Sequence, residues 1–150
     1  KFINFKSGTS ILDFGTGGGF PGIPLAILFP ECRFTLIDGT GKKVRVAQEV
    51  ATTIGLKNVK TKHIRGEEEK GKYDFVVSRA VMPLPELIKI VRKNISKQQK
   101  NVLLNGIICL KGGSLEDELK PFSNIVQVTE ISNWFTEEWF QTKQVVYLPL

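Results

Sequence analysis

A glycine-rich turn that directly follows a short apolar segment constrains this chain more than any other feature. Ser10–Phe14 has the pattern of a buried strand, and the next five residues include Gly15, Gly17, Gly18 and Gly19. Glycines let the backbone turn tightly and approach a ligand with no Cβ in the way, but each costs up to about 1 kcal/mol relative to alanine. Because an ordinary turn needs one or two glycines, this density favours a ligand-binding loop over a purely structural turn.

The rest of the chain alternates between strand-like and helix-like patterns. Strands are predicted at residues 10–14, 33–37, 59–64, 73–77, 101–110, 125–131 and 144–148. Helices are predicted near residues 20–29, 42–54, 84–95 and 114–119. In the second helix, the face expected to be buried carries Val46, Ala47, Val50, Ala51 and Ile54. We therefore expect an α/β fold in a single domain over residues 1–150, with a mostly parallel seven-stranded sheet and helices on both faces.

Two acidic residues narrow the ligand that the glycine loop binds. Asp38 ends the second predicted strand, 19 residues after Gly19, where a carboxylate can accept hydrogen bonds from ribose hydroxyls. Asp13 stands inside the first strand, where a dinucleotide fingerprint normally has an apolar residue. The third glycine of the loop also comes one residue sooner than the Gly-x-Gly-x-x-Gly spacing requires. Asp13 and this spacing favour S-adenosylmethionine (SAM) over a nicotinamide dinucleotide.

Basic residues are expected along the edge of the sheet where the ligand binds. The chain has 21 Lys and Arg against 15 Asp and Glu, a net charge of +6 that suits a polyanion but does not by itself identify one. Lys42, Lys43 and Arg45 fall in the first turn of a helix, where the helix dipole disfavours cations. They form either a solvated charge run or a patch that contacts phosphates. Arg79 and Lys111 each follow a predicted strand, and their shared position beside the loop favours a functional role over simple solvation.

Metal and membrane sites are not expected. Cys32 and Cys109 lie in strand-like contexts and form no Cys-x-x-Cys pair, and His63 is the only histidine. We expect two buried, reduced thiols in a cytoplasmic protein, and a histidine that packs rather than acts as a base. No apolar run reaches the roughly 18 residues that span a bilayer.

The sequence also limits which atom could accept a methyl group. Neither cysteine follows a proline, as the nucleophile in pyrimidine carbon-5 methylation typically does, and the segment after the fourth strand lacks an Asp/Asn-Pro-Pro-aromatic run. A ring nitrogen with a free lone pair, such as guanine N7, needs no proton removed before attack. The lack of an evident general base is consistent with that target.

Several motifs together closely resemble one known family. They are Asp13–Ala26, Asp38 with Lys42 and Lys43, Arg65–Glu68, Ser78–Val81 and Leu110–Gly112. This set is similar to the RsmG family, also called GidB, of bacterial small-subunit rRNA guanine-N7 methyltransferases. The similarity extends from about Ile11 to Gly113, and the Gly-Phe-Pro-Gly-Ile-Pro run at residues 19–24 is its most specific part. The resemblance implies the Rossmann-like class I SAM-dependent methyltransferase fold.

The resemblance also implies roles for individual residues. The residues implied to bind SAM are Gly15, Gly17, Gly19 and Phe20 in the loop, Asp38 at the ribose, Gly66 and Glu67 at the adenine, and Arg79 against the cofactor or target base. Arg79 and Lys111 are the expected catalytic residues, and Arg79 could hold only guanine O6 or a phosphate, because N7 is the nucleophile. Lys111 and the basic residues Lys42, Lys43 and Arg45 are assigned to RNA on physical grounds.

The chain departs from the family pattern in two ways. Gly66 stands where alanine is usual, a difference expected to change little. The family normally carries a helical segment of several dozen residues before the first strand, which this sequence does not include. If that segment holds part of the RNA-binding surface, we expect the chain to bind SAM yet methylate poorly. The expected partner is small-subunit rRNA or the small ribosomal subunit, bound by a monomer. A small-molecule SAM methyltransferase and an inactive SAM-binding module remain as alternatives.

Overall fold

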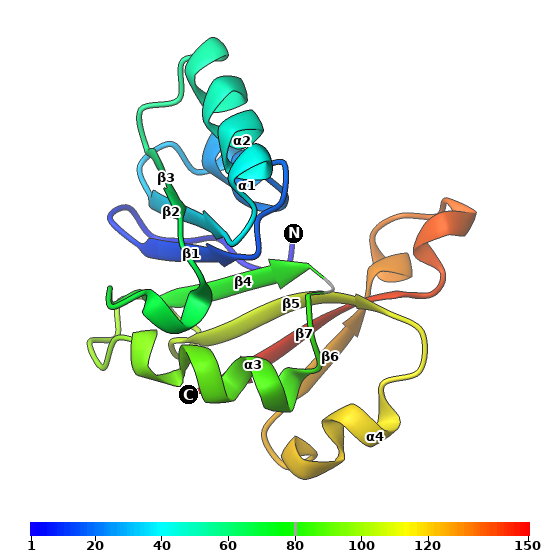
Figure 1. Ribbon diagram of the computed structural model, residues 1–150. Helices are drawn as coiled ribbons and strands as arrows, with labels where there is room; N and C mark the ends of the chain where they lie inside the picture. Colours follow the sequence, from blue (N-terminus) through cyan, green and yellow to red (C-terminus); the bar gives the residue numbers. More distant parts are fainter. Residues whose placement is uncertain (80) are drawn as a thin grey trace.

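A computed structural model, which describes residues 1–79 and 81–150, contains one seven-stranded sheet (Figure 1). The strands are β1 (Ser10–Phe14), β2 (Arg33–Asp38), β3 (Val59–His63), β4 (Phe75–Arg79), β5 (Gly106–Gly112), β6 (Gln127–Glu130) and β7 (Lys143–Pro149). Their order is β3-β2-β1-β4-β5-β7-β6. The first five are parallel, whereas β7 is antiparallel to both β5 and β6. The expected mostly parallel seven-stranded sheet is confirmed.

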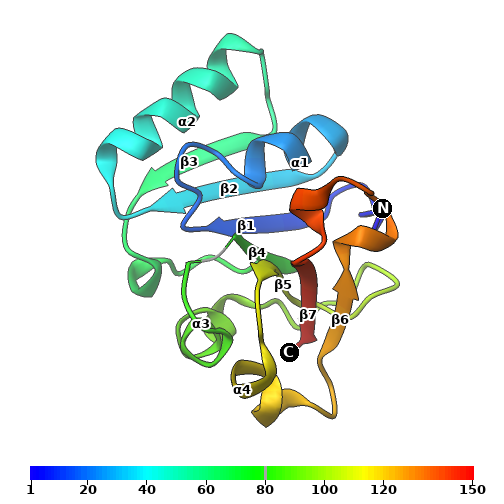
Figure 2. The ribbon, with the colours of Figure 1, turned by 90° about the vertical axis from the view of Figure 1, so that its right-hand side faces the viewer.

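Helices cover both faces of this sheet, as predicted (Figure 2). They are α1 (Gly22–Leu28), α2 (Gly41–Thr53), α3 (Leu84–Val91) and α4 (Glu116–Leu119). Because successive strand residues point to opposite faces, the buried side chains divide into two cores. Ile11 and Phe75 pack with α1 and α2, whereas Leu12 and Val76 pack with α3 and α4.

Only β1 has the predicted bounds; the other strand ends that differ do so by one or two residues, apart from the start of β5, which differs by five. The segment 101–105 is not part of β5, because the buried Asn105 side chain donates to the carbonyls of Ser96 and Gln98 and holds this segment in a loop. Val102 in this loop is 94% exposed. β4 begins two residues later than expected, since the Asp74 side chain accepts the backbone N–H of Ser10.

The buried face of α2 also differs from the prediction. Ala47 and Ala51 are buried as expected, together with Val44, but Val46 and Val50 are 49% and 39% exposed. Ile54, which follows the helix, is exposed as well. The buried residues lie at spacings of three and four, so the helix rests on the sheet through a narrow face of mostly small side chains.

Candidate functional site

The glycine loop lies at the point where the strand order reverses. β1 pairs with β2 on one side and with β4 on the other, so the loops that follow β1 and β4 leave the sheet at the same edge. Gly15 and Gly17 have φ angles of 66° and 58°, in the left-handed region that L side chains rarely adopt. A Cβ on Gly15 would also lie 2.6 Å from a methyl carbon of Val81. The loop conformation therefore requires glycine.

Asp38 connects this loop to the start of α2. One carboxylate oxygen accepts the backbone N–H of Gly17 at 2.9 Å, and the other accepts that of Thr40 at 2.8 Å. The side chain is half-buried and lines the cleft described below. A carboxylate oxygen accepts more than one hydrogen bond, so Asp38 can still receive a ribose hydroxyl. Its assignment to the ribose stays a prediction.

Asp13 is a functional candidate for which the sequence analysis predicted no role beyond distinguishing the cofactor. It is fully buried, and its Oδ2 accepts the hydroxyl of Thr16 at 2.6 Å and the N–H of Gly22 at 2.7 Å. Its Oδ1 is buried and has no hydrogen-bond partner among the described residues. Burial raises the pKa of Asp13 to about 6, against the opposing effects of these hydrogen bonds and the charge of Arg79.

A cleft of about 560 Å³ is lined by predicted SAM-binding residues that come from separate segments of the sequence. Gly15, Asp38, Gly66 and Glu67 all line it, from the loops that follow β1, β2 and β3. Gly66 begins a short 3-10 turn, Gly66–Glu68, and packs directly against the ring of Phe14. A Cβ on Gly66 would overlap this ring. Glycine in place of the usual alanine therefore matters for packing in this chain, whereas its expected small effect on the cofactor contact stays a prediction.

Gly66→Ala tests that close approach. The Phe14 ring is buried and cannot move aside freely, so we expect the variant to lose about 1–3 kcal/mol of unfolding free energy through overpacking. Urea unfolding measures the loss. Adding Phe14→Leu, which provides room for the methyl group, should recover part of it relative to Phe14→Leu alone. A Gly66→Ala variant as stable as the wild type would contradict this packing.

Arg79 ends β4 beside the glycine loop. Its guanidinium carbon lies 5.6 Å from the centroid of the Phe20 ring, which is 51% exposed. Within residues 1–79 and 81–150, no carboxylate lies within ion-pair distance of Arg79. Its charge is therefore available to an anionic or polar ligand at this edge. Ala80, part of the Ser78–Val81 motif, lies outside the described residues.

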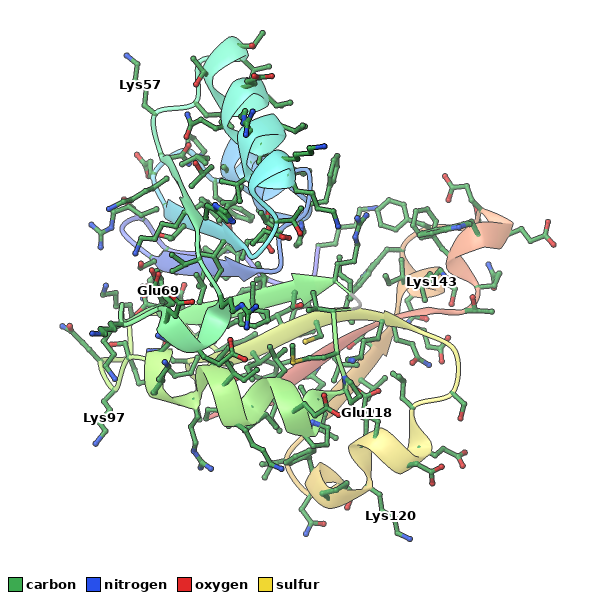
Figure 3. The ribbon with its side chains drawn as sticks, viewed as in Figure 1. Lys57, Glu69, Lys97, Glu118, Lys120 and Lys143 are labelled. Atoms are coloured by element: carbon green, nitrogen blue, oxygen red, sulfur yellow. The ribbon has the colours of Figure 1, made fainter. Side chains whose placement is uncertain are left out.

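Lys111 is held within the protein rather than extended toward solvent. Its amino group lies 2.5 Å from an oxygen of Glu118 and donates to the Met82 carbonyl at 2.9 Å, and its side chain is 8% exposed. The same Glu118 oxygen accepts the N–H of Leu84 at 2.6 Å. Figure 3 shows Glu118 between α3 and α4. These contacts tie β5 to the segment before α3, and they give no support to the prediction that Lys111 contacts RNA.

Lys111→Met distinguishes a structural role of Lys111 from a role in RNA binding. If Lys111 stabilises the fold through its ion pair with Glu118, the substitution leaves Glu118 without its cation. We then expect the unfolding free energy to fall by about 2 kcal/mol. The double variant with Glu118→Gln should recover part of this loss. If Lys111 instead binds RNA, the melting temperature will stay unchanged while RNA affinity falls.

The other predicted residues lie at the edges of the site. Lys42, Lys43 and Arg45 are exposed on α2 and, in the described part of the chain, have no ion-pair partner. They line neither the 560 Å³ cleft nor the cavity beyond Arg79, so their RNA contact stays a prediction. His63 is exposed, with Nε2 3.1 Å from the Gly39 carbonyl.

The two cysteines are buried and unpaired, as predicted, and burial raises the pKa of Cys109 to about 12. The described residues include no group of three or more His, Cys, Asp or Glu side chains placed to hold a metal ion. Nor do they form a helix with the length and apolar character needed to cross a bilayer.

Comparison with known proteins identifies the family. A family model described as rRNA small subunit methyltransferase G matches residues 1–146. The chain belongs to this family. Ribosomal RNA small subunit methyltransferase G of Bacteroides fragilis is 61% identical over 150 residues, which cover 100% of this chain and 73% of that protein. The protein of the same name from Bacteroides thetaiotaomicron is 63% identical over 147 residues, 98% of this chain and 71% of that protein.

Solved structures support the fold. A SAM-dependent methyltransferase from Aquifex aeolicus superposes with a TM-score of 0.69 at 20% identity, over 97% of this chain and 84% of that chain. At this identity the likeness concerns the fold alone. It confirms the expected Rossmann-like class I methyltransferase architecture, and the family match confirms the resemblance found in the sequence.

Proposed function

We propose that this chain transfers the methyl group of SAM to N7 of a guanine in small-subunit rRNA. The observation that carries the proposal is the cleft in which Gly15, Asp38, Gly66 and Glu67 meet, at the reversal of the sheet where β4 ends at Arg79. The family and the names of its curated relatives support rRNA as the substrate. The protein acts as a monomer in the cytoplasm, on the rRNA or on the assembled small subunit.

The residues of the cleft fit SAM. Its sulfonium makes the attached methyl group electrophilic, and this is the chemistry that the cofactor supplies when it is bound. Asp38 would accept the ribose hydroxyls, Gly66 and Glu67 would meet the adenine, and Gly15 would lie along the remainder together with Phe20 from outside the cleft lining. Asp13 adds a buried, unpartnered carboxylate oxygen behind the loop. Two carboxylates near the glycine loop favour a cofactor that carries positive charge.

Catalysis in this proposal is mainly positioning. In-line transfer to a ring nitrogen needs aligned reactants and no proton removal, so the chain needs no general base near the loop. Arg79 holds guanine O6 or a neighbouring phosphate and leaves N7 free. Lys111 positions the segment between β4 and α3 through the Met82 carbonyl. Lys42, Lys43 and Arg45 contact RNA phosphates on the α2 side.

Mapping of the methylated nucleotide tests this function. Small subunits and free rRNA from a bacterium that lacks this modification would be incubated with the purified chain and SAM. Borohydride and aniline then cleave the RNA at N7-methylguanosine, and primer extension locates the break. One new cleavage site that requires both chain and SAM is expected. Methyl transfer to RNA without any aniline-sensitive site would contradict the proposed target atom.

A further inference from the structure

A second cavity, of about 720 Å³, lies beyond Arg79 and is lined by a segment that the sequence did not connect with the site. This segment, residues 131–142, links β6 to β7 and projects from the sheet at the edge where β4 and β5 end (Figure 1). The cavity lies between the segment and the sheet, and its lining includes Arg79, Lys111, Ile131, Trp139, Phe140 and Lys143. None of the residues that line this cavity also lines the 560 Å³ cofactor cleft. The cavity is therefore distinct from that cleft, and Arg79 is the one predicted SAM-binding residue in its lining.

Trp139 is the most unusual of these lining residues because its large side chain is 67% exposed. The ring of Phe140 packs edge-on against the indole, with 5.2 Å between the centroids, and Phe140 in turn contacts Phe135. The amino group of Lys143, at the start of β7, lies 4.7 Å from the indole centroid (Figure 3). The indole is thus supported within an aromatic cluster yet retains a large surface open to a ligand.

The charge around Trp139 selects a ligand that combines an aromatic ring with negative charge. The cavity lining includes three cations and no acidic residue, although Glu137 and Glu138 are exposed in the same segment. The ammonium of Lys111 is paired with Glu118, whereas Arg79 and Lys143 have no carboxylate within ion-pair distance among the described residues. An exposed indole in a cavity that two such cations also line matches how proteins hold unpaired nucleotides, by stacking the base and contacting the phosphate.

We infer that Trp139 stacks on the base of an unpaired nucleotide of the RNA substrate and that Lys143 binds an adjacent phosphate. This inference rests on the proposed function for the identity of the substrate. Arg79 lies at the boundary between the cofactor loop and this cavity, so a nucleotide held by Trp139 lies at the side from which the target guanine reaches SAM. Trp139 and Lys143 are therefore substrate-binding residues outside the motifs that carry the family resemblance.

Intrinsic fluorescence tests the stacking directly, because the chain has only two tryptophans. A short single-stranded RNA is titrated into the wild type, Trp139→Phe and Trp134→Phe without SAM. Trp134 is half-buried against Phe2 and serves as the matched control. We expect RNA to quench the wild type and Trp134→Phe, and to leave Trp139→Phe unquenched. Quenching that persists in Trp139→Phe and disappears in Trp134→Phe would overturn the inference.

Affinity and its salt dependence separate stacking from charge. Trp139→Ala is expected to weaken RNA binding roughly tenfold with an unchanged salt slope, and Trp139→Phe should recover most of this loss. Lys143→Ala should reduce the slope of log K against log salt by about 0.7, the contribution of one single-strand phosphate contact. Melting temperatures and SAM affinities close to wild type would show that both variants fold. Unchanged RNA affinity in folded Trp139→Ala would overturn the inference.

Kinetics distinguish failure of this inference from failure of the proposed function. If the wild type methylates rRNA and Trp139→Ala does so with the same KM, the stacking role is wrong and the function stands. If the wild type transfers no methyl group to rRNA, the function is wrong, and the fluorescence titration still decides whether Trp139 stacks on RNA bases. We expect a raised KM for RNA in Trp139→Ala, with kcat changed less than KM.

Discussion

Arg79→Ala is expected to lower kcat on rRNA about a hundredfold, the effect typical of removing one donor that acts on the reacting group. Arg79 lies beside the glycine loop and lines the cavity that Trp139 also lines. Among the described residues, no carboxylate lies within ion-pair distance of its guanidinium. Single-turnover methylation with saturating SAM and RNA measures the change. Arg79→Lys keeps the charge but loses the planar fork, so we expect it to recover only part of the rate.

SAM affinity shows which ligand Arg79 contacts. If the side chain holds the target guanine, calorimetry will find SAM binding by Arg79→Ala within roughly threefold of wild type. The charge of Arg79 also lowers the pKa of Asp13, so that pKa should rise in the variant. An unchanged kcat in a variant that binds SAM normally would remove Arg79 from the catalytic residues.

Asp13→Ala is expected to have the largest effect on stability, a loss of about 3 kcal/mol of unfolding free energy. The substitution removes the acceptor of two short hydrogen bonds and leaves the N–H of Gly22 and the hydroxyl of Thr16 unpaired in a buried position. Asp13→Asn is the matched control, because its amide oxygen can still accept both bonds. Urea unfolding should therefore find Asp13→Asn more stable than Asp13→Ala at pH 7. Equal stabilities would contradict the proposed role of these hydrogen bonds.

The contribution of Asp13 to the unfolding free energy is expected to fall as pH rises. The folded pKa of about 6 lies above the ordinary aspartate value of 3.8, so the folded state binds the proton more tightly than the unfolded state. The contribution of this group to stability is therefore greatest below pH 4 and falls by about 3 kcal/mol as pH rises through 6. In Asp13→Asn this part of the pH dependence disappears. A difference between wild type and Asp13→Asn that stays constant from pH 4 to 7 would contradict the raised pKa.

Cofactor binding should shift Asp13 from its protonated form toward its ionised form. SAM carries positive charge, so it favours the ionised form of Asp13 and should release a proton when it binds near pH 6. Calorimetry in buffers of different ionisation enthalpy measures this proton. SAM affinity of the wild type should rise between pH 5 and 7, and that of Asp13→Asn should change less.

The sheet and the cofactor cleft were largely predictable because their signals are local. Residues 10–14 form a short, mostly apolar strand pattern that ends in glycines, and Asp38 directly follows the strand pattern of residues 33–37. Once the strands are parallel, their carboxyl ends must lie at one edge, which brings Gly15, Asp38 and Gly66 to the same cleft. Predicting that the glycine loop binds a cofactor therefore required no information about contacts between distant segments.

Sequence patterns did not predict the features that depend on contacts between distant segments. The burial of Lys111 depends on Glu118 and the Met82 carbonyl, and no local pattern indicates that pairing. The prediction of the buried face of α2 was wrong because Val46 and Val50 have the periodicity of a core face. The residues buried in the structure are instead Val44, Ala47 and Ala51. Trp139 was missed because its segment has neither glycine nor regular periodicity, although a tryptophan among acidic and polar residues was a usable signal.

Methyl transfer to guanine N7 requires that nitrogen atom, so replacing it in the RNA is a decisive test. Small-subunit rRNA would be transcribed once with guanosine and once with 7-deazaguanosine, which replaces N7 by a carbon–hydrogen unit. Both transcripts would be incubated with the chain and SAM labelled in its methyl group. We predict label in the guanosine transcript and none in the 7-deazaguanosine transcript. Equal incorporation into both would contradict the account.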